Sequence, residues 1–183
     1  MENDMSTKRI ARIAALLAVL AAGACNRSGA DKPEESGTSS ALSPEARALA
    51  DEVLNAYEAL RARLAADAVA DVPALAERLE RAATGMARAA PASLQPRAVA
   101  LGASARLLRE TKELEKLREA FGEVSRQLVS ILVIEPSLRR GRHVFECPMA
   151  RGYKKWIQTS SKLSNPYMGK AMLECGAESS WSS

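Results

Sequence analysis

The sequence predicts an all-α protein: a four-helix up-down bundle with a small C-terminal lobe made of a loop and a short helix. The chain has 183 residues, which suits one domain with an appendage. Its apolar content is 47% and its aromatic content only 4%, so Ala, Leu and Val must supply most of the core. Apolar residues recur every three or four positions along four segments, as they do on one face of a helix. A β-sandwich would need more β-branched and aromatic residues.

Residues 1–24 predict a lipoprotein signal peptide, which is not part of the fold. The basic residues Lys8, Arg9 and Arg12 precede an apolar stretch from Ile13 to Ala22. That stretch is too short to span a bilayer comfortably and has the order of charge and hydrophobicity seen in export signals.

Cys25 is the predicted lipidation site. The small residues of "AAGAC" resemble the cleavage site of bacterial lipoproteins, although Ala22 stands where Leu is expected. Asn26, in place of Asp, favours the outer membrane, so we expect a lipid-anchored protein on the periplasmic side of the bacterial envelope. An ordinary secretory peptide with a chance cysteine is the alternative. Residues 25–42 are polar and rich in Ser and Gly, which is typical of a flexible tether.

The helical domain with its lobe is expected over residues 43–183. Ser43 supplies a capping hydroxyl, Pro44 suits the first helical position, and Glu45 lies in the first turn. The apolar stripe of this first helix is Leu49, Val53, Tyr57, Leu60 and Leu64. After a break at residues 67–73, the stripe of a second helix is Leu75, Leu79, Ala82 and Met86.

Two further helices follow a turn bracketed by Pro91 and Pro96. The third is expected from about Arg97 to Arg109. The fourth has the most regular stripe, which is Leu114, Leu117, Phe121, Val124, Leu128 and Ile131. It should stop before Pro136, because proline lacks the N–H that a continuing helix needs.

The lobe, residues 137–178, contains two of the three cysteines, three of the six methionines and the single histidine. Residues 143–145 are expected to be extended or loop-like, and Pro148 biases Cys147 away from helical geometry. In an extended chain, Cys147 and Met149 project to the same side.

A short helix from Pro166 to Cys175 is predicted by the cap Asn165 and by Gly176, which suits the residue after a helix. Met168, Met172 and Cys175 stand at positions i, i+4 and i+7 of that helix, so they would share one face.

This collection of sulfur predicts a site for a soft metal ion. Thiolate and thioether donors favour Cu(I), with Ag(I) as a second candidate, whereas zinc prefers thiolate and imidazole. The expected ligands are Cys147, Met149, Met172 and Cys175, with Met168 and His143 as further candidates. Simpler interpretations stay open: a Cys147–Cys175 disulfide in the oxidising periplasm, methionines that only pack, and an ordinary surface histidine.

The segment "CPMARGYKKW…NPYMGKAMLECG" resembles the C-terminal signature of a bacterial family of exported domains of unknown function. Members occur alone and as C-terminal extensions of CusB-type periplasmic adaptors of copper and silver efflux pumps. The matching positions are Cys147, Pro148, Met149, Ala150, Trp156, Asn165, Pro166, Tyr167, Gly169, Met172, Leu173, Cys175 and Gly176. "VLNAYEALRARLAAD" is similar to the family's first helix, so the resemblance covers residues 49–176.

This chain departs from the family pattern at three places. The stretch "RGYKK" before Trp156 is short, Glu146 replaces a common aromatic, and Met168 replaces Phe or Tyr. The resemblance implies association with heavy metals, most of all copper.

The expected function is therefore periplasmic binding of Cu(I) or Ag(I), accessory to metal efflux or buffering, with an efflux-system or other envelope protein as partner. The alternative is a structural lipoprotein pinned by its disulfide, without metal function. We do not expect an enzyme, because one histidine and no phosphate-binding or Cys-x-x-Cys motif leave few catalytic arrangements. The modest net charge of +4 does not predict nucleic-acid binding.

Overall fold

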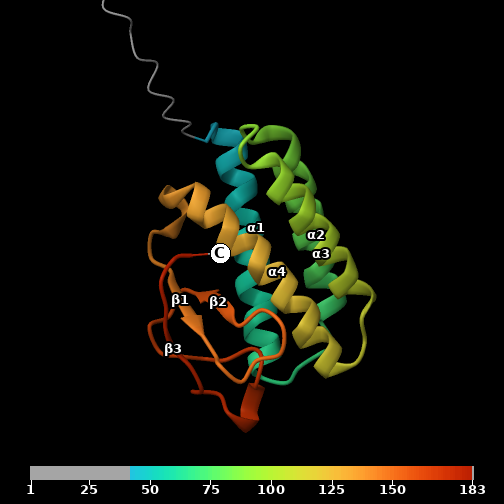
Figure 1. Cartoon of the computed structure of the whole chain (residues 1–183). Coiled ribbons are helices and arrows are strands. Elements are labelled where there is room, and N and C mark those ends of the chain that lie inside the picture. The colour runs from blue at the N-terminus through green and yellow to red at the C-terminus, as the bar shows by residue number, and fades with distance from the viewer. Residues whose placement is uncertain (1–41, 183) are drawn as a thin grey trace, which may run out of the picture. The chain divides into compact units, whose positions relative to one another are not determined.

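Four helices, two 3-10 turns and three short strands make up residues 42–182, the part of the chain that this computed structural model describes (Figure 1). The predicted signal peptide, the lipidation site Cys25 and residues 25–41 of the predicted tether lie outside the described residues. The last residue assigned to the tether, Leu42, is already buried in the core. The helices are α1 (Pro44–Ala65), α2 (Val72–Ala89), α3 (Gln95–Glu110) and α4 (Leu114–Ile134).

The four predicted helices are confirmed, and their ends follow the expected signals. Ser43 Oγ accepts a hydrogen bond of 3.1 Å from the backbone N–H of Ala46, and Pro44 is the first residue of α1. Helix α4 ends at Ile134, two residues before Pro136, which begins the 3-10 turn η1 (Pro136–Arg139). None of the helices within residues 42–182 is long and apolar enough to cross a membrane.

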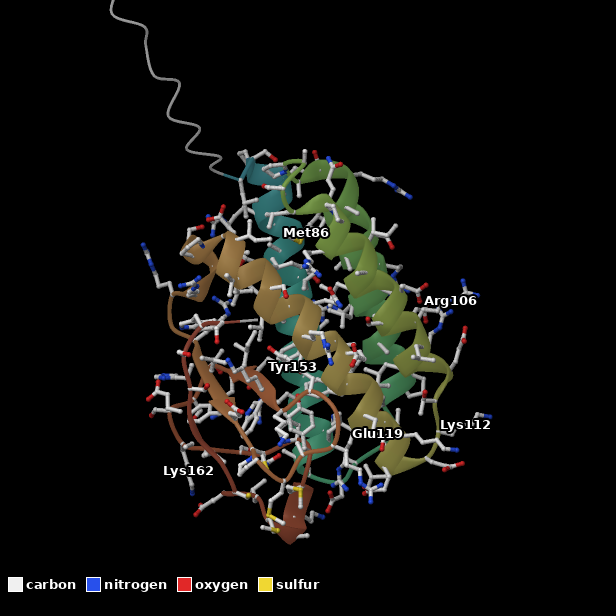
Figure 2. All side chains as sticks on the ribbon, in the orientation of Figure 1. Met86, Arg106, Lys112, Glu119, Tyr153 and Lys162 are labelled. Carbon is white, nitrogen blue, oxygen red and sulfur yellow. The ribbon has the colours of Figure 1, made fainter. Side chains whose placement is uncertain are left out.

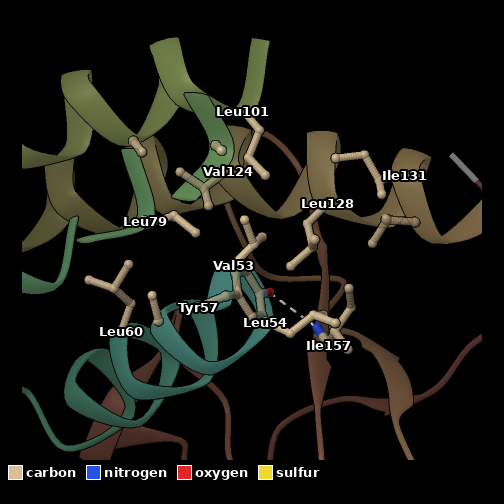
Figure 3. Close-up of a cluster of buried hydrophobic side chains, with 14 of the residues drawn as sticks. Val53, Leu54, Tyr57, Leu60, Leu79, Leu101, Val124, Leu128, Ile131 and Ile157 are labelled. Atoms are coloured by element: carbon tan, nitrogen blue, oxygen red, sulfur yellow. Dashed lines mark hydrogen bonds between the residues drawn. The ribbon is translucent and has the colours of Figure 1, made fainter. Parts of the chain in front are cut away.

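The helical stripes form the core, as their spacing predicts. Leu49, Leu75 and Leu114, which begin three of the stripes, are partly buried, and all the other predicted stripe residues are buried. Consecutive helices pack against each other, and α4 also meets α1, where the Tyr57 and Phe121 rings stack with centroids 5.0 Å apart. Figure 3 shows part of this core, in which Val53, Leu79 and Val124 point toward one another from three different helices.

A three-stranded antiparallel sheet follows the helices, so the all-α prediction was wrong for the C-terminal lobe. The strands are β1 (His143–Glu146), β2 (Lys155–Gln158) and β3 (Ala177–Glu178), in the order β2-β1-β3. Strand β2 lies against α4 and α1. Residues 143–145, expected to be extended or loop-like, are extended and belong to β1. The pairing was missed because strands of two to four residues are too short to show alternation, and Trp156, Ile157 and Gln158 are all buried.

Tyr57 joins the sheet to the helices. Its buried hydroxyl lies 2.8 Å from Ser125 Oγ on α4 and accepts a hydrogen bond of 3.2 Å from the backbone N–H of Ile157 on β2 (Figure 3). Burial raises the pKa of the Tyr57 phenol, so the group stays neutral and able to donate. One hydroxyl thus satisfies polar groups from two other elements.

Replacing Tyr57 with phenylalanine should lower the free energy of unfolding by about 1–3 kcal/mol, because the Ile157 N–H and the Ser125 hydroxyl would be left buried without this partner. Tyr153→Phe is the matched control. The Tyr153 hydroxyl is buried and has no hydrogen-bond partner among residues 42–182, so its removal should cost less than about 0.5 kcal/mol or stabilise the protein. Urea unfolding of both variants tests this, and equal losses would contradict it.

Candidate thiol and metal site

Cys147 and Cys175, which lie 28 positions apart in the sequence, meet at one end of the sheet. Cys147 follows β1 and Cys175 stands two residues before β3, and these strands pair with Glu146 opposite Ala177. The two Sγ atoms are 3.4 Å apart, and both cysteines are free thiols. Cys147 is fully buried, whereas Cys175 is half-buried. The structure thus forms a thiol pair with one fixed and one accessible member.

A tight turn follows Cys147 and presents Pro148 and Met149 to solvent. The backbone N–H of Ala150 donates to the Cys147 carbonyl over 3.2 Å and closes the turn. Lys154 Nζ donates to the Pro148 carbonyl over 2.9 Å and holds the turn from its other side. The Met149 side chain is 59% exposed, so this thioether is free to meet a ligand from solvent.

The predicted helix from Pro166 to Cys175 does not form, and this expectation was wrong. Asn165 caps a first turn as predicted, because its Oδ1 accepts hydrogen bonds of 2.7 and 3.1 Å from the N–H groups of Tyr167 and Met168. Gly169, however, adopts a φ of +56°, a left-handed value that a right-handed helix cannot include. Only the 3-10 turn η2 (Gly169–Ala171) follows.

Without that helix, Met168, Met172 and Cys175 do not share a helical face. Met172 is held near Cys175 by a different turn, in which the Cys175 N–H donates to the Met172 carbonyl over 3.0 Å. Met172 is 37% exposed. Met168 is partly buried and, together with Met149, lines a cavity of about 240 Å³ beside Arg118. The predicted sulfur ligands are therefore divided between the thiol pair with its two turns and this neighbouring cavity.

His143 is not part of the thiol site. It stands at the opposite end of β1 from Cys147, and four residues of strand span about 13 Å. Its Nδ1 lies 3.2 Å from Glu178 Oε1, and its strand partner is Gln158. The imidazole therefore contacts a carboxylate, and it does not lie beside the two cysteines.

The pKa of Cys175 is raised, first by its hydrogen bond with Cys147, then by desolvation and by the proximity of the Cys147 sulfur. The Cys175 thiol therefore keeps its proton at neutral pH unless a ligand displaces that proton. A bound metal ion can do so, because metals bind the thiolate and release the proton.

Asn165 positions Cys175, a role that the sequence did not reveal. Its buried Nδ2 donates to the Cys175 carbonyl over 2.6 Å, while its Oδ1 caps the turn at Tyr167. Gly176, next to Cys175, has a φ of +139°, and a Cβ there would lie 2.9 Å from the Glu146 carbonyl oxygen. The sequence signal for Asn165 was its capping role, and nothing local pointed to Cys175, ten residues away.

Two charged residues hold the turn at Gly169 against the helices. Asp67, between α1 and α2, pairs with Arg118 on α4, and Asp67 Oδ2 accepts a hydrogen bond of 3.2 Å from the Lys170 N–H. On α1, Arg61 pairs with Glu58 and donates to the Ser164 carbonyl over 2.9 Å. These contacts fix the turn that carries Met172 and Cys175.

Three aromatic rings form the packed interior of the lobe that carries the thiol site. Trp156 is fully buried and stacks on Phe145 with ring centroids 5.6 Å apart, and it meets Tyr167 edge-on at 5.9 Å. The Tyr167 hydroxyl donates to the Lys155 carbonyl over 2.6 Å. Much of the motif that suggested a metal family is thus the packed core of the lobe, and the accessible donors are Met149, Met172 and Cys175.

Histidine, cysteine and acidic side chains alone do not form a metal site within residues 42–182: no group of three or more of them is placed to hold an ion. Beyond the two thiols, the donors that the adjoining turns supply are the thioether sulfurs of Met149 and Met172. Figure 2 shows sulfur atoms gathered around η2, at the end of the molecule away from Met86. Thiolate and thioether sulfur are donors that soft ions favour, and thioether is a rare ligand of zinc.

No family model, no curated protein and no solved structure matches this chain.

Proposed function

We propose that the protein binds a soft monovalent metal ion, Cu(I) first and Ag(I) second, through Cys147 and Cys175 on the periplasmic side of the envelope. In this role a lipid-anchored helical bundle carries the metal lobe and serves metal efflux or buffering, with an efflux or other envelope protein as partner. The observation that carries the proposal is the pair of free thiols with Sγ atoms 3.4 Å apart.

The thiol pair needs only a small displacement to hold an ion. Two sulfur atoms on one tetrahedral metal ion lie roughly 3.8 Å apart, given a metal–sulfur distance of about 2.3 Å for zinc. Cys147 is buried and fixed, so Cys175 would supply the movement, and it lies on a half-exposed turn. Met172 and Met149, each on a turn that also contains one of the cysteines, are the candidates for the third donor.

Exposure of the donors suits transfer of the ion rather than permanent storage. Met149 and Met172 are 59% and 37% exposed, so a partner's own sulfur ligand can reach the ion from solvent. Met168 lies with Met149 on the adjoining cavity and would receive the ion at a second, weaker position. His143, pairing with Glu178 at the far end of β1, is left out of the proposed ligand set.

The test is competition for Cu(I) between the reduced chain and a coloured Cu(I) chelator. The full-length chain would carry Cys25→Ser in every sample, so that only Cys147 and Cys175 are titrated. We expect one tightly bound ion per chain. Replacing both cysteines with serine should weaken binding by more than about 100-fold, because even outer-shell changes at metal sites cost 10- to 100-fold. Affinity should rise with pH, since binding displaces the raised-pKa proton of Cys175.

Two further variants serve as controls for the ligand set. Met172→Leu should weaken binding, whereas Met86→Leu, in the buried core of α2, should not. Unchanged affinity in the variant that lacks Cys147 and Cys175 would refute the metal-binding proposal.

A disulfide between Cys147 and Cys175 is the second candidate, and the same sulfur contact favours it. Joining sulfur atoms 28 positions apart would stabilise the lobe by about 3–4 kcal/mol on the chain-entropy account. The protein would then be a structural lipoprotein in which the disulfide joins the end of β1 to the segment before β3 within the lobe. Mass analysis of protein isolated without reductant from metal-replete cells separates the two, because a quantitative disulfide there would favour the structural role.

A further inference from the structure

Arginines without a carboxylate partner are not spread evenly over the domain. Most arginines within residues 42–182 form ion pairs with Asp or Glu. Those that form none in this part of the chain are Arg47, Arg88, Arg97, Arg139, Arg140 and Arg142. We call these six residues the basic end, because they lie at one end of the helical layer.

The order and direction of the helices bring the six arginines to the same end. Arg47 lies near the start of α1, Arg88 in the last turn of α2, Arg97 in the first turn of α3, and residues 139–142 follow α4. Figure 1 shows the start of α1, the end of α2 and the start of α3 at the same end of the helical layer, with the end of α4 beside them.

Contacts of α1 with α2 and with η1 also place these helix ends together. A Cβ on Gly85, near the end of α2, would lie 2.9 Å from Leu49 near the start of α1. Arg47 Nη2 donates to Ser137 Oγ on η1 over 2.6 Å, which ties the start of α1 to the segment after α4.

Packing and helix dipoles explain only some of these positions. Arg88 is favourable in the last turn of α2, and Arg139 donates to the carbonyls of Leu132 and Val133 in the last turn of α4. Arg97, however, lies in the first turn of α3, where the helix dipole disfavours positive charge. Its side chain is exposed and makes no hydrogen bond to any residue between 42 and 182, and the same holds for Arg140.

A cavity of about 350 Å³ at this end is lined by Arg47, Arg140 and Arg142, with Asp51 as its one carboxylate. Two of these guanidiniums are held in place: Arg47 by Ser137, and Arg142 by the carbonyls of Leu138 and Arg140 over 2.9 and 3.0 Å. A guanidinium has five N–H donors, so each keeps several free for a phosphate. Glu45 and Glu135 also lie at this end and offset part of the positive charge.

We propose that the basic end is a docking surface for anionic phospholipids. A membrane is the partner that fits because the chain before residue 42, with the predicted lipidation site Cys25, leads directly into this end. An anchor at Cys25, 17 positions before Leu42, would limit the distance between lipid and domain to about 60 Å at full extension, but it would not set the orientation of the domain. Arginines facing the same membrane would do so, because each cation near an anionic surface adds attraction.

This orientation directs the thiol site away from the lipid. Asp67, in the connection between α1 and α2 at the opposite end of the helices, binds the Lys170 N–H beside the turns that carry Met172 and Cys175. The membrane proposal does not depend on copper binding, and the two can fail separately.

The experiment measures partition of the unlipidated full-length chain, with Cys25→Ser in all samples, into phosphatidylcholine vesicles with and without phosphatidylglycerol. We expect a clear preference for the anionic vesicles. Arg97→Gln with Arg140→Gln should reduce that preference about 10- to 30-fold, at roughly fivefold per charge. The control is Lys112→Gln with Lys170→Gln, two exposed residues away from the basic end: Figure 2 labels Lys112, and the Lys170 N–H binds Asp67 between α1 and α2. This control removes the same charge and should reduce the preference less than about twofold.

Two further measurements separate docking from general charge and from damage to the fold. Arg97→Gln should leave the melting temperature unchanged or raise it, because a dipole-disfavoured charge is removed. Inorganic phosphate should displace the wild-type chain from vesicles no better than sodium chloride of equal ionic strength. Equal losses in the two double variants would overturn the proposal. Displacement by phosphate alone would also overturn it, because the arginines would then serve a soluble anion.

Discussion

Replacing Gly169 with alanine is expected to lower the free energy of unfolding by about 3–5 kcal/mol. The residue has a φ of +56°, which costs an L-amino acid with a Cβ roughly 1–2 kcal/mol. An added Cβ would also overlap Asp67 Oδ1 and Arg118 Nη2. These two side chains form a largely buried ion pair, and separating such a pair is strongly destabilising.

Gly152→Ala provides a matched control for this substitution. Gly152 has a φ of +68°, but a Cβ there would meet nothing within 4 Å. Only the backbone cost of roughly 1–2 kcal/mol should remain. Urea unfolding monitored by the fluorescence of buried Trp156 gives both values in the same lobe. Equal losses at the two glycines would show that the Asp67–Arg118 pair does not hold the turn.

The helical layer could be predicted from the sequence because its signals are local. Ser43 and Pro44 mark the start of α1, Pro136 limits α4, and the stripes run for several turns each. Each of these features acts within about one turn of helix, so neighbouring residues carry enough information.

The lobe could be predicted only in part, because long-range contacts decide its shape. Asn165 correctly indicated a capped turn, yet Gly169 turns the chain away after that first turn and brings its backbone against Asp67, about a hundred positions earlier. That contact belongs to the packing of the lobe on α1 and α4, and no local pattern contains it. The predicted helical face of sulfur therefore became two separate turns.

The proximity of Cys147 and Cys175 was expected, but its cause was not. The two thiols meet because β3 pairs with β1, and β3 has only two residues. His143 was a candidate ligand because it is four positions from Cys147 in the sequence. In a strand those positions separate the side chains by about 13 Å, whereas in a helix they would have been neighbours.

Asn165→Asp is the substitution expected to link the stability of the lobe to pH. The new oxygen would replace Nδ2, which donates to the Cys175 carbonyl over 2.6 Å, and would set a charged acceptor against an acceptor in a fully buried position. The acceptor toward the Tyr167 and Met168 N–H groups would be kept. At pH 7 the variant should lose at least about 3 kcal/mol of unfolding free energy.

That loss should shrink in acid. Burial and the Cys175 carbonyl would raise the pKa of the introduced carboxyl in the folded state above its unfolded value of about 3.9. The folded variant then binds a proton that the unfolded chain does not, in the window between the two pKa values. Its stability relative to the wild type therefore rises as pH falls through the folded-state pKa, and levels off below about 3.9. The protonated carboxyl can again donate to the Cys175 carbonyl.

Asn165→Ala separates this effect from simple loss of the side chain. Alanine has no titrating group, so its penalty relative to the wild type should stay constant with pH. Urea unfolding of both variants between pH 7 and pH 4 gives the comparison. If Asn165 positions Cys175, both variants should also weaken Cu(I) binding at pH 7, since the half-buried thiol would no longer be held beside Cys147. Parallel pH curves for Asp and Ala would mean that the Cys175 carbonyl does not depend on the Asn165 amide.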